Sequence, residues 1–148
     1  MILQTDLRLN ETINKTGCYL MCIFYLVNKY TNLMLSDVII NNYFLLLQTI
    51  KGRYSTYVLA SNGYVNDVDK IFNYLGLDVT YTGVHESPKY LCKSGEIEIL
   101  CLQNKSNHNL FHFVVGDGNG NETYNPMGTS KDYILYSKRI FIINKPRG

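Results

Sequence analysis

The chain has 148 residues, a length typical of one globular domain, and we expect a single domain over residues 1–148. Hydrophobic residues make up 46% of the chain and charged residues 18%, which excludes a disordered tail or a polyelectrolyte. The net charge of +2 is too small to indicate a nucleic-acid or membrane-surface partner.

The longest apolar run, Cys18 to Val27, is about half the ~20 residues that a membrane-spanning helix needs. Charged residues of both signs precede it and no small-residue cleavage site follows, so it does not resemble a signal peptide. We therefore expect a cytoplasmic protein with reduced cysteines and no membrane partner.

Three segments in the first half have helical patterns: residues 16–30, 36–50 and 66–75. Thr16 and Ser36 are the expected N-caps of the first two helices, while Gly52 and Gly76 mark helix ends. The first helix is apolar on nearly all sides, which predicts that it is deeply buried.

Six later segments have the alternating pattern of strands: residues 79–81, 96–102, 111–115, 122–124, 133–136 and 139–143. The glycine-rich residues 116–121 are the strongest hairpin signal in the chain. Helices followed by strands predict an α+β fold, with N-terminal helices packed on a C-terminal antiparallel meander.

Cys18 is the first candidate for chemistry, because it lies in the first turn of the predicted buried helix. Unpaired backbone N–H groups and the positive end of the helix dipole stabilise a thiolate there. A cysteine at such a position is also a common core residue, so Cys18 needs a partner to be a nucleophile.

His112 is the candidate partner, because the predicted hairpin brings it close to Asn125. If Gly118 and Asn119 form the loop, His112 and Asn125 are directly opposite each other. If the loop is one residue later, Asn125 lies opposite Val114 and is a diagonal neighbour of His112. Both registers place an amide oxygen beside the imidazole, where it would fix the tautomer and leave the other nitrogen to accept a thiol proton.

The order Cys, His, Asn in three short motifs resembles the papain-like cysteine peptidases. The motifs are Gly17-Cys18-Tyr-Leu-Met, His112-Phe-Val-Val-Gly and Tyr124-Asn125-Pro126. They are most similar to the compact branch of bacteriocin-processing peptidases, and the whole chain also resembles an uncharacterised family of small spirochaete plasmid and phage proteins. The resemblance implies a papain-like fold with Cys18 as nucleophile, His112 as general base and acid, and Asn125 as the orienting residue.

Two positions differ from the pattern of that branch. Tyr19 follows the nucleophile where a small residue is usual, and Thr12 stands where the branch has an oxyanion-stabilising Gln. Asn14 is the candidate amide donor for the oxyanion, and Gln4 is another. No metal and no organic cofactor is expected.

Other residues have simpler interpretations. The cysteines Cys18, Cys22, Cys92 and Cys101 do not have the paired spacing of a structural zinc site, and a disulfide within the first helix would be strained. His108 and His85 are expected in loops, and Lys138 and Arg139 on the surface.

The sequence thus predicts a thiol-dependent amide hydrolase that acts on a peptide or a peptidoglycan cross-link. The alternative is a catalytically inactive papain-like domain that binds a protein or peptide. A thiol redox module is a third reading, and the oligomeric state is left open.

Overall fold

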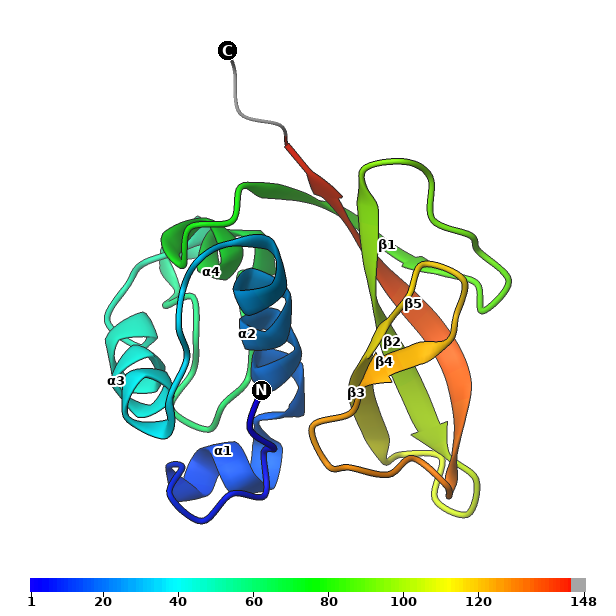
Figure 1. The fold of residues 1–148 in the computed structure, drawn as a ribbon, viewed down its shortest axis with the longest axis horizontal. Helices are drawn as coiled ribbons and strands as arrows, with labels where there is room; N and C mark the ends of the chain where they lie inside the picture. The colour runs from blue at the N-terminus through cyan, green and yellow to red at the C-terminus, as the bar shows by residue number, and fades with distance from the viewer. Residues whose placement is uncertain (145–148) are drawn as a thin grey trace.

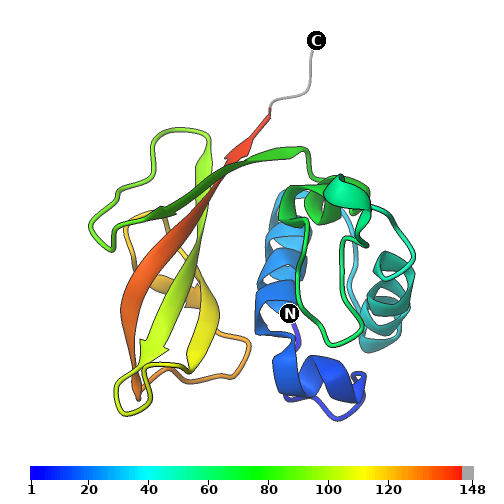
Figure 2. The same ribbon diagram turned by 180° about the vertical axis from the view of Figure 1, so that it is seen from behind.

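The computed structural model describes residues 1–144 and has the predicted α+β architecture. The N-terminal half forms a group of short helices, and the C-terminal half forms a strongly twisted antiparallel sheet (Figures 1 and 2). Helix α2 lies between the other helices and the sheet, so it is the central element of the fold.

The helices are α1 (Glu11–Thr16), α2 (Cys18–Tyr30), α3 (Asp37–Leu47), a 3-10 turn (Arg53–Ser55) and α4 (Val68–Tyr74). Ser36 caps α3 as predicted, because its hydroxyl accepts a hydrogen bond from the N–H of Ile39. The prediction for Thr16 is wrong: it is the last residue of α1, and Gly17 is the N-cap of α2. Helix α3 also ends at Leu47, before the predicted Gly52. Within residues 1–144 no helix is long and apolar enough to cross a membrane.

The strands are β1 (Val79–Glu86), β2 (Glu96–Asn104), β3 (Phe111–Gly116), β4 (Glu122–Tyr124) and β5 (Tyr133–Ile143). Their order in the sheet is β1-β5-β2-β3-β4, and all neighbours are antiparallel. The predicted strands 133–136 and 139–143 form one strand, which pairs with both β1 and β2. The sheet is therefore a meander only from β2 to β4, and His85 lies in strand β1 rather than in a loop.

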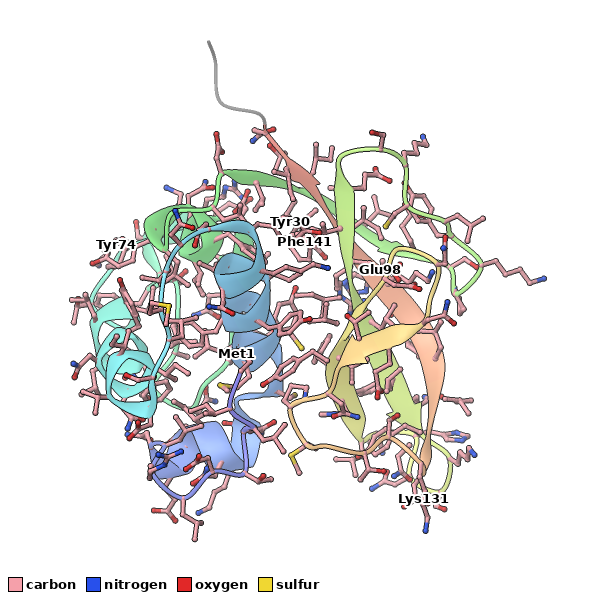
Figure 3. All side chains as sticks on the ribbon, viewed as in Figure 1. Met1, Tyr30, Tyr74, Glu98, Lys131 and Phe141 are labelled. Atoms are coloured by element: carbon pink, nitrogen blue, oxygen red, sulfur yellow. The ribbon has the colours of Figure 1, made fainter. Side chains whose placement is uncertain are left out.

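The main core fills the space between α2 and one face of the sheet (Figure 3). Phe141 of β5 lies in this layer with no exposed surface, and its ring packs against those of Phe72 and Tyr81. Tyr25 of α2 stacks on Tyr124 of β4 with ring centroids 4.6 Å apart. Burial of this core, which contains aliphatic and aromatic side chains, holds the helices on the sheet.

The β3–β4 hairpin adopts the later of the two predicted registers. Val115 pairs with Tyr124, and a bulge then shifts the register so that Gly116 pairs with Glu122. Asp117 stabilises the turn as expected, because its carboxylate accepts hydrogen bonds from the N–H groups of Asn119 and Asn121.

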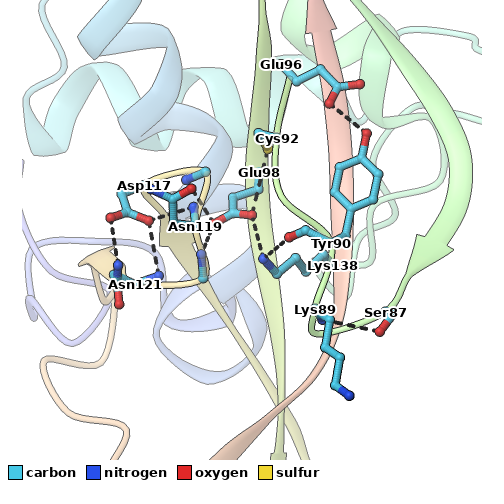
Figure 4. Close-up of polar contacts among 12 residues, drawn as sticks. Ser87, Lys89, Tyr90, Cys92, Glu96, Glu98, Asp117, Asn119, Asn121 and Lys138 are labelled. Carbon is cyan, nitrogen blue, oxygen red and sulfur yellow. Dashed lines mark hydrogen bonds and ion pairs between the residues drawn. The ribbon is translucent and has the colours of Figure 1, made fainter. Parts of the chain in front are cut away.

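A buried ion pair anchors the turn of this hairpin (Figure 4). Glu98 of β2 and Lys138 of β5 are fully buried, with Nζ 3.2 Å from the carboxylate. The carboxylate also accepts hydrogen bonds from the N–H groups of Gly118 and Gly120. A Cβ atom at Gly116 would lie only 2.3 Å from the Glu98 carboxylate, so the close approach requires glycine there. The expectation that Lys138 is a surface residue is wrong, because its charge is compensated inside the fold.

Removing one charge of this pair is expected to destabilise the protein strongly. Lys138→Met leaves the Glu98 carboxylate buried without its cation, which typically costs about 3–5 kcal/mol. Urea unfolding followed by circular dichroism measures the change. The control is Lys15→Met, which breaks an exposed pair with Glu11 and should leave the midpoint nearly unchanged. Equal midpoints for the two variants would contradict a stabilising role for the buried pair.

Candidate active site

Cys18 is the first residue of α2, and its thiol lies against the start of strand β3. Gly17 provides no side chain to cap the helix, so the N–H groups of the first turn are left for other partners. Burial raises the pKa of the Cys18 thiol, while the N–H groups of Phe113, Tyr19 and Cys18 itself lower it. Burial outweighs these N–H groups, so the resting side chain is a neutral thiol.

His112 and Asn125 form the buried polar contact that the hairpin predicts. The imidazole Nε2 lies 2.7 Å from the Asn125 Oδ1, and both side chains are more than nine-tenths buried. In the observed register Asn125 follows the last residue of β4, so it approaches His112 as a diagonal neighbour. The sequence therefore predicted this contact correctly.

The orientation of the Asn125 amide determines the tautomer of His112. The Asn125 Oδ1 accepts a hydrogen bond from the N–H of Met127, and the Asn125 Nδ2 donates to the Glu122 carboxylate. The oxygen therefore faces the ring, and Nε2 must carry the proton to donate to it. The other ring nitrogen, Nδ1, is left with a lone pair that can accept a proton.

The environment of His112 favours the neutral ring. Burial lowers the pKa of His112 below its ordinary value of 6.5, while the bond to Asn125 and the charge of Glu122 act in the opposite direction. A neutral imidazole is the form in which a histidine can accept a proton from a neutral thiol.

The structure brings Cys18 to the backbone next to His112 without joining the two side chains. The thiol is near the N–H of Phe113, the residue that follows His112. Neighbouring residues of a strand point to opposite faces, so the His112 side chain leaves β3 on the other side from Phe113. Its ring lies there, 5.7 Å from that of Tyr133. Within residues 1–144 the thiol and the ring form no hydrogen bond.

Asn14 and Gln4, the two candidate amide donors for the oxyanion, are hydrogen-bonded to each other but differ in their other partners. Asn14 donates its side-chain amide to the carbonyls of Gln4 and Asp6, so it is already committed to holding the N-terminal segment. Gln4 is buried and donates to the Asn14 carbonyl, and its own Oε1 has no partner within the described residues. The backbone N–H of Gln4 also donates to the Pro126 carbonyl, next to Asn125. The Asn14 amide group is thus occupied by the N-terminal segment. Gln4 instead connects helix α1, through the Asn14 carbonyl, to the loop that contains Asn125.

A cavity of about 460 Å³ opens beside Cys18, between the helical half and the sheet. Tyr19 and Phe113 form part of its lining, with ring centroids 4.5 Å apart, and Tyr81 contributes a third ring. Arg139 lies over Phe113, with its guanidinium carbon 5.6 Å from the ring centroid. The volume is within the range of about 300–1,000 Å³ that is usual for small-molecule and peptide pockets.

Charged residues line the opposite wall of the cavity. Arg53 donates from its guanidinium to Asp69 and from its backbone N–H to Asp67. Both carboxylates are at least nine-tenths buried, and each has one oxygen without a hydrogen bond within the described residues. Within that same part of the chain, no group of three His, Cys, Asp or Glu side chains could hold a metal ion.

The sequence did not single out these charged residues. Asp67 and Asp69 belong to the segment 66–75, which was predicted only to be helical, and Arg139 was expected on the surface. Arg139 in fact lines the cavity and is half-buried. Its position beside Phe113 depends on the pairing of β5 with β2, in which Arg139 lies opposite Ile99, 40 residues earlier in the chain. No short-range pattern in the sequence contains that information.

The chain belongs to DUF261, a family described as proteins of unknown function, whose family model matches residues 1–143. The expectation of an uncharacterised family is therefore confirmed. No curated protein and no solved structure matches the chain.

The contact between His112 and Asn125 predicts how His112 titrates. NMR of the ring protons should give a midpoint below 6.5, because burial disfavours the charged ring. The bond to Asn125 raises the pKa, so Asn125→Ala should lower the midpoint further. A midpoint at or above 6.5 in the unmodified protein would show that the ring is not buried as described.

Proposed function

We propose that this DUF261 protein is a thiol-dependent amide-bond hydrolase of the papain-like type, acting on a peptide or a peptidoglycan cross-link. The observation that carries the proposal is the buried His112–Asn125 hydrogen bond, with the Cys18 thiol at the adjacent peptide of β3. An oriented imidazole with a free nitrogen and a thiol at a helix N-terminus are the two parts that such a reaction needs.

In the first half of the proposed reaction the proton of the Cys18 thiol moves to the Nδ1 of His112, and the sulfur forms a bond to the amide carbonyl carbon. The imidazolium then gives its proton to the leaving nitrogen, the C–N bond breaks, and an amine departs. Asn125 keeps its oxygen on Nε2 throughout, so the ring presents the same nitrogen at both steps.

In the second half water attacks the thioester that remains on Cys18. His112 accepts a proton from the water and returns it to the sulfur, which releases a carboxylic acid and restores the thiol. No electron is gained or lost, so these residues need no redox partner for this step.

The negative oxygen of the intermediate requires hydrogen-bond donors. The backbone N–H of Cys18 is one, because the first turn of a helix has no internal partner for it. Gln4 is the better side-chain candidate, since it bonds to Asn14, four residues before Cys18, and is not held by two carbonyls as Asn14 is.

The neutral resting thiol favours a second candidate, a catalytically inactive domain that binds a peptide in the same cavity. Burial raises the pKa of Cys18, and within residues 1–144 no hydrogen bond joins it to His112. Hydrogen bonds of catalytic groups often form only when substrate is bound, so we favour the enzyme. The two candidates differ in whether a bound peptide is cleaved.

Incubation with a peptide library and with peptidoglycan stem peptides, followed by mass spectrometry of released amines, tests the proposal. We expect hydrolysis that is lost in Cys18→Ala and falls about 10²–10⁴-fold in His112→Ala. Cys92→Ala is the matched control, because Cys92 is half-buried and lies beside Glu98, in the loop between β1 and β2. Peptides that bind without being cleaved, or cleavage that persists in Cys18→Ala, would contradict the proposal.

The rate of hydrolysis should fall on the acid side of pH 6.5. His112 must be neutral to accept the thiol proton, and its pKa lies below 6.5, so activity is kept at neutral pH and is lost as the pH falls through that pKa. A rate that stays constant well below the titration midpoint of His112 would exclude it as the base.

A further inference from the structure

The charges that line the cavity beside Cys18 lie in two groups: Arg53 with Asp67 and Asp69 on one wall, and Arg139 on the sheet side. Arg53 is engaged by Asp67 and Asp69, at 2.8 Å from Asp69 and 3.6 Å from Asp67. The acidic pair thus has one cation for its two charges, so one negative charge remains on this wall.

In the described part of the chain, Arg139 has no comparable partner. Its Nη1 donates to the Ser137 hydroxyl at 2.8 Å, and its guanidinium lies over the Phe113 ring. Both contacts are to neutral groups, and within residues 1–144 no carboxylate forms an ion pair with it. Arg139 therefore presents to the cavity a positive charge that has no ion-pair partner among the described residues.

His85 stands opposite Arg139 in the β1–β5 pairing and also lines the cavity. Burial and the nearby Arg139 lower the pKa of His85, so this ring is mostly neutral at neutral pH. It adds a hydrogen-bonding group beside the guanidinium without adding a second charge. The positive potential on this side of the cavity thus comes from one residue.

Phe113 connects the guanidinium to the thiol. Its ring lies beneath Arg139, and its backbone N–H is near the Cys18 sulfur. A group bound to Arg139 would therefore lie on the other side of the Phe113 side chain from the Cys18 sulfur. The rings of Tyr19 and Phe113 would contact the apolar part of a ligand that extends from the Arg139 guanidinium to the Cys18 sulfur.

We propose that Arg139 determines substrate specificity by binding a carboxylate that lies close to the amide bond cleaved by Cys18. A planar guanidinium fixed over a ring matches the two oxygens of a carboxylate better than a lysine would. The substrate class is an acidic amide, such as a peptide with a free carboxylate next to the scissile bond. The inference deepens the proposed hydrolase function. The claim that the bound carboxylate belongs to a substrate rests on that function, whereas the claim that Arg139 binds an anion does not.

Two methanethiosulfonate reagents of opposite charge test the anion preference without any hydrolysis. Sulfonatoethyl methanethiosulfonate is negative and trimethylammonioethyl methanethiosulfonate is positive, and both convert a thiol into a mixed disulfide. The rate at Cys18 is measured by mass mapping of each cysteine, and Cys92, beside the Glu98 carboxylate, is the internal comparison. We expect Cys18 to favour the negative reagent by about 5- to 30-fold relative to Cys92.

Arg139→Gln should abolish this preference at Cys18, and Arg139→Lys should keep only part of it. Arg8→Gln is the control for net charge, because Arg8 is exposed and paired with Asp6. It should leave the preference unchanged. A preference for the positive reagent, or an equal preference in Arg139→Gln, would overturn the proposal.

A binding measurement covers the case in which Cys18 reacts with neither reagent. N-acetylalanine and its uncharged amide are titrated into the protein, and backbone amide shifts around Phe113 are followed by NMR. The proposal requires shifts with the acid that the amide does not cause and that Arg139→Gln removes. Equal shifts with both compounds, or none, would refute it. Anion binding without hydrolysis would leave Arg139 as a ligand-binding residue and refute the hydrolase.

Discussion

The rings of Tyr19 and Phe113 hold the start of helix α2 against the start of strand β3, with centroids 4.5 Å apart. This contact joins the helical half to the sheet at the point where all the candidate chemistry lies. It brings the thiol of Cys18 to the N–H of Phe113, and His112 is the neighbouring residue on the same strand. Tyr19, the large residue after Cys18, thus has a packing role here.

The sequence predicted the local parts of the site better than their assembly. Both predicted registers of the β3–β4 hairpin placed Asn125 beside His112, because only two short strands and one turn separate the two residues. The sequence could not choose between the registers, since the bulge at Gly116 depends on the approach of Glu98 from another strand. It also could not place the thiol, whose contact with β3 joins positions far apart in the chain.

The predictions of the fold that were wrong also concern contacts between segments far apart in the chain. Strand β5 lies between β1 and β2, so neither of its neighbours precedes it directly in the sequence. Two consecutive basic residues of β5 therefore lie in different environments. Lys138 is fully buried against Glu98, whereas Arg139 lines the cavity. From the sequence alone both were expected on the surface, because a lysine is rarely buried unless a distant partner compensates it.

The balance between burial and hydrogen bonding defines the resting state of the site. Burial raises the pKa of Cys18 and lowers that of His112, so both groups are neutral near pH 7. This differs from a preformed thiolate–imidazolium pair. In the proposed reaction His112 would therefore remove the thiol proton as the new bond forms, and the N–H groups at the helix start and in β3 would stabilise the negative sulfur.

The pH dependence of Cys18 alkylation by iodoacetamide tests this account most directly. If His112 acts as the base, the rate should be nearly constant between about pH 7 and 9 and should fall below the pKa of His112. In His112→Ala the rate near pH 7 should drop at least about tenfold and then rise roughly tenfold per pH unit, as for an isolated thiol. The same rising profile in both proteins would show that the imidazole never reaches the thiol, and would contradict the account.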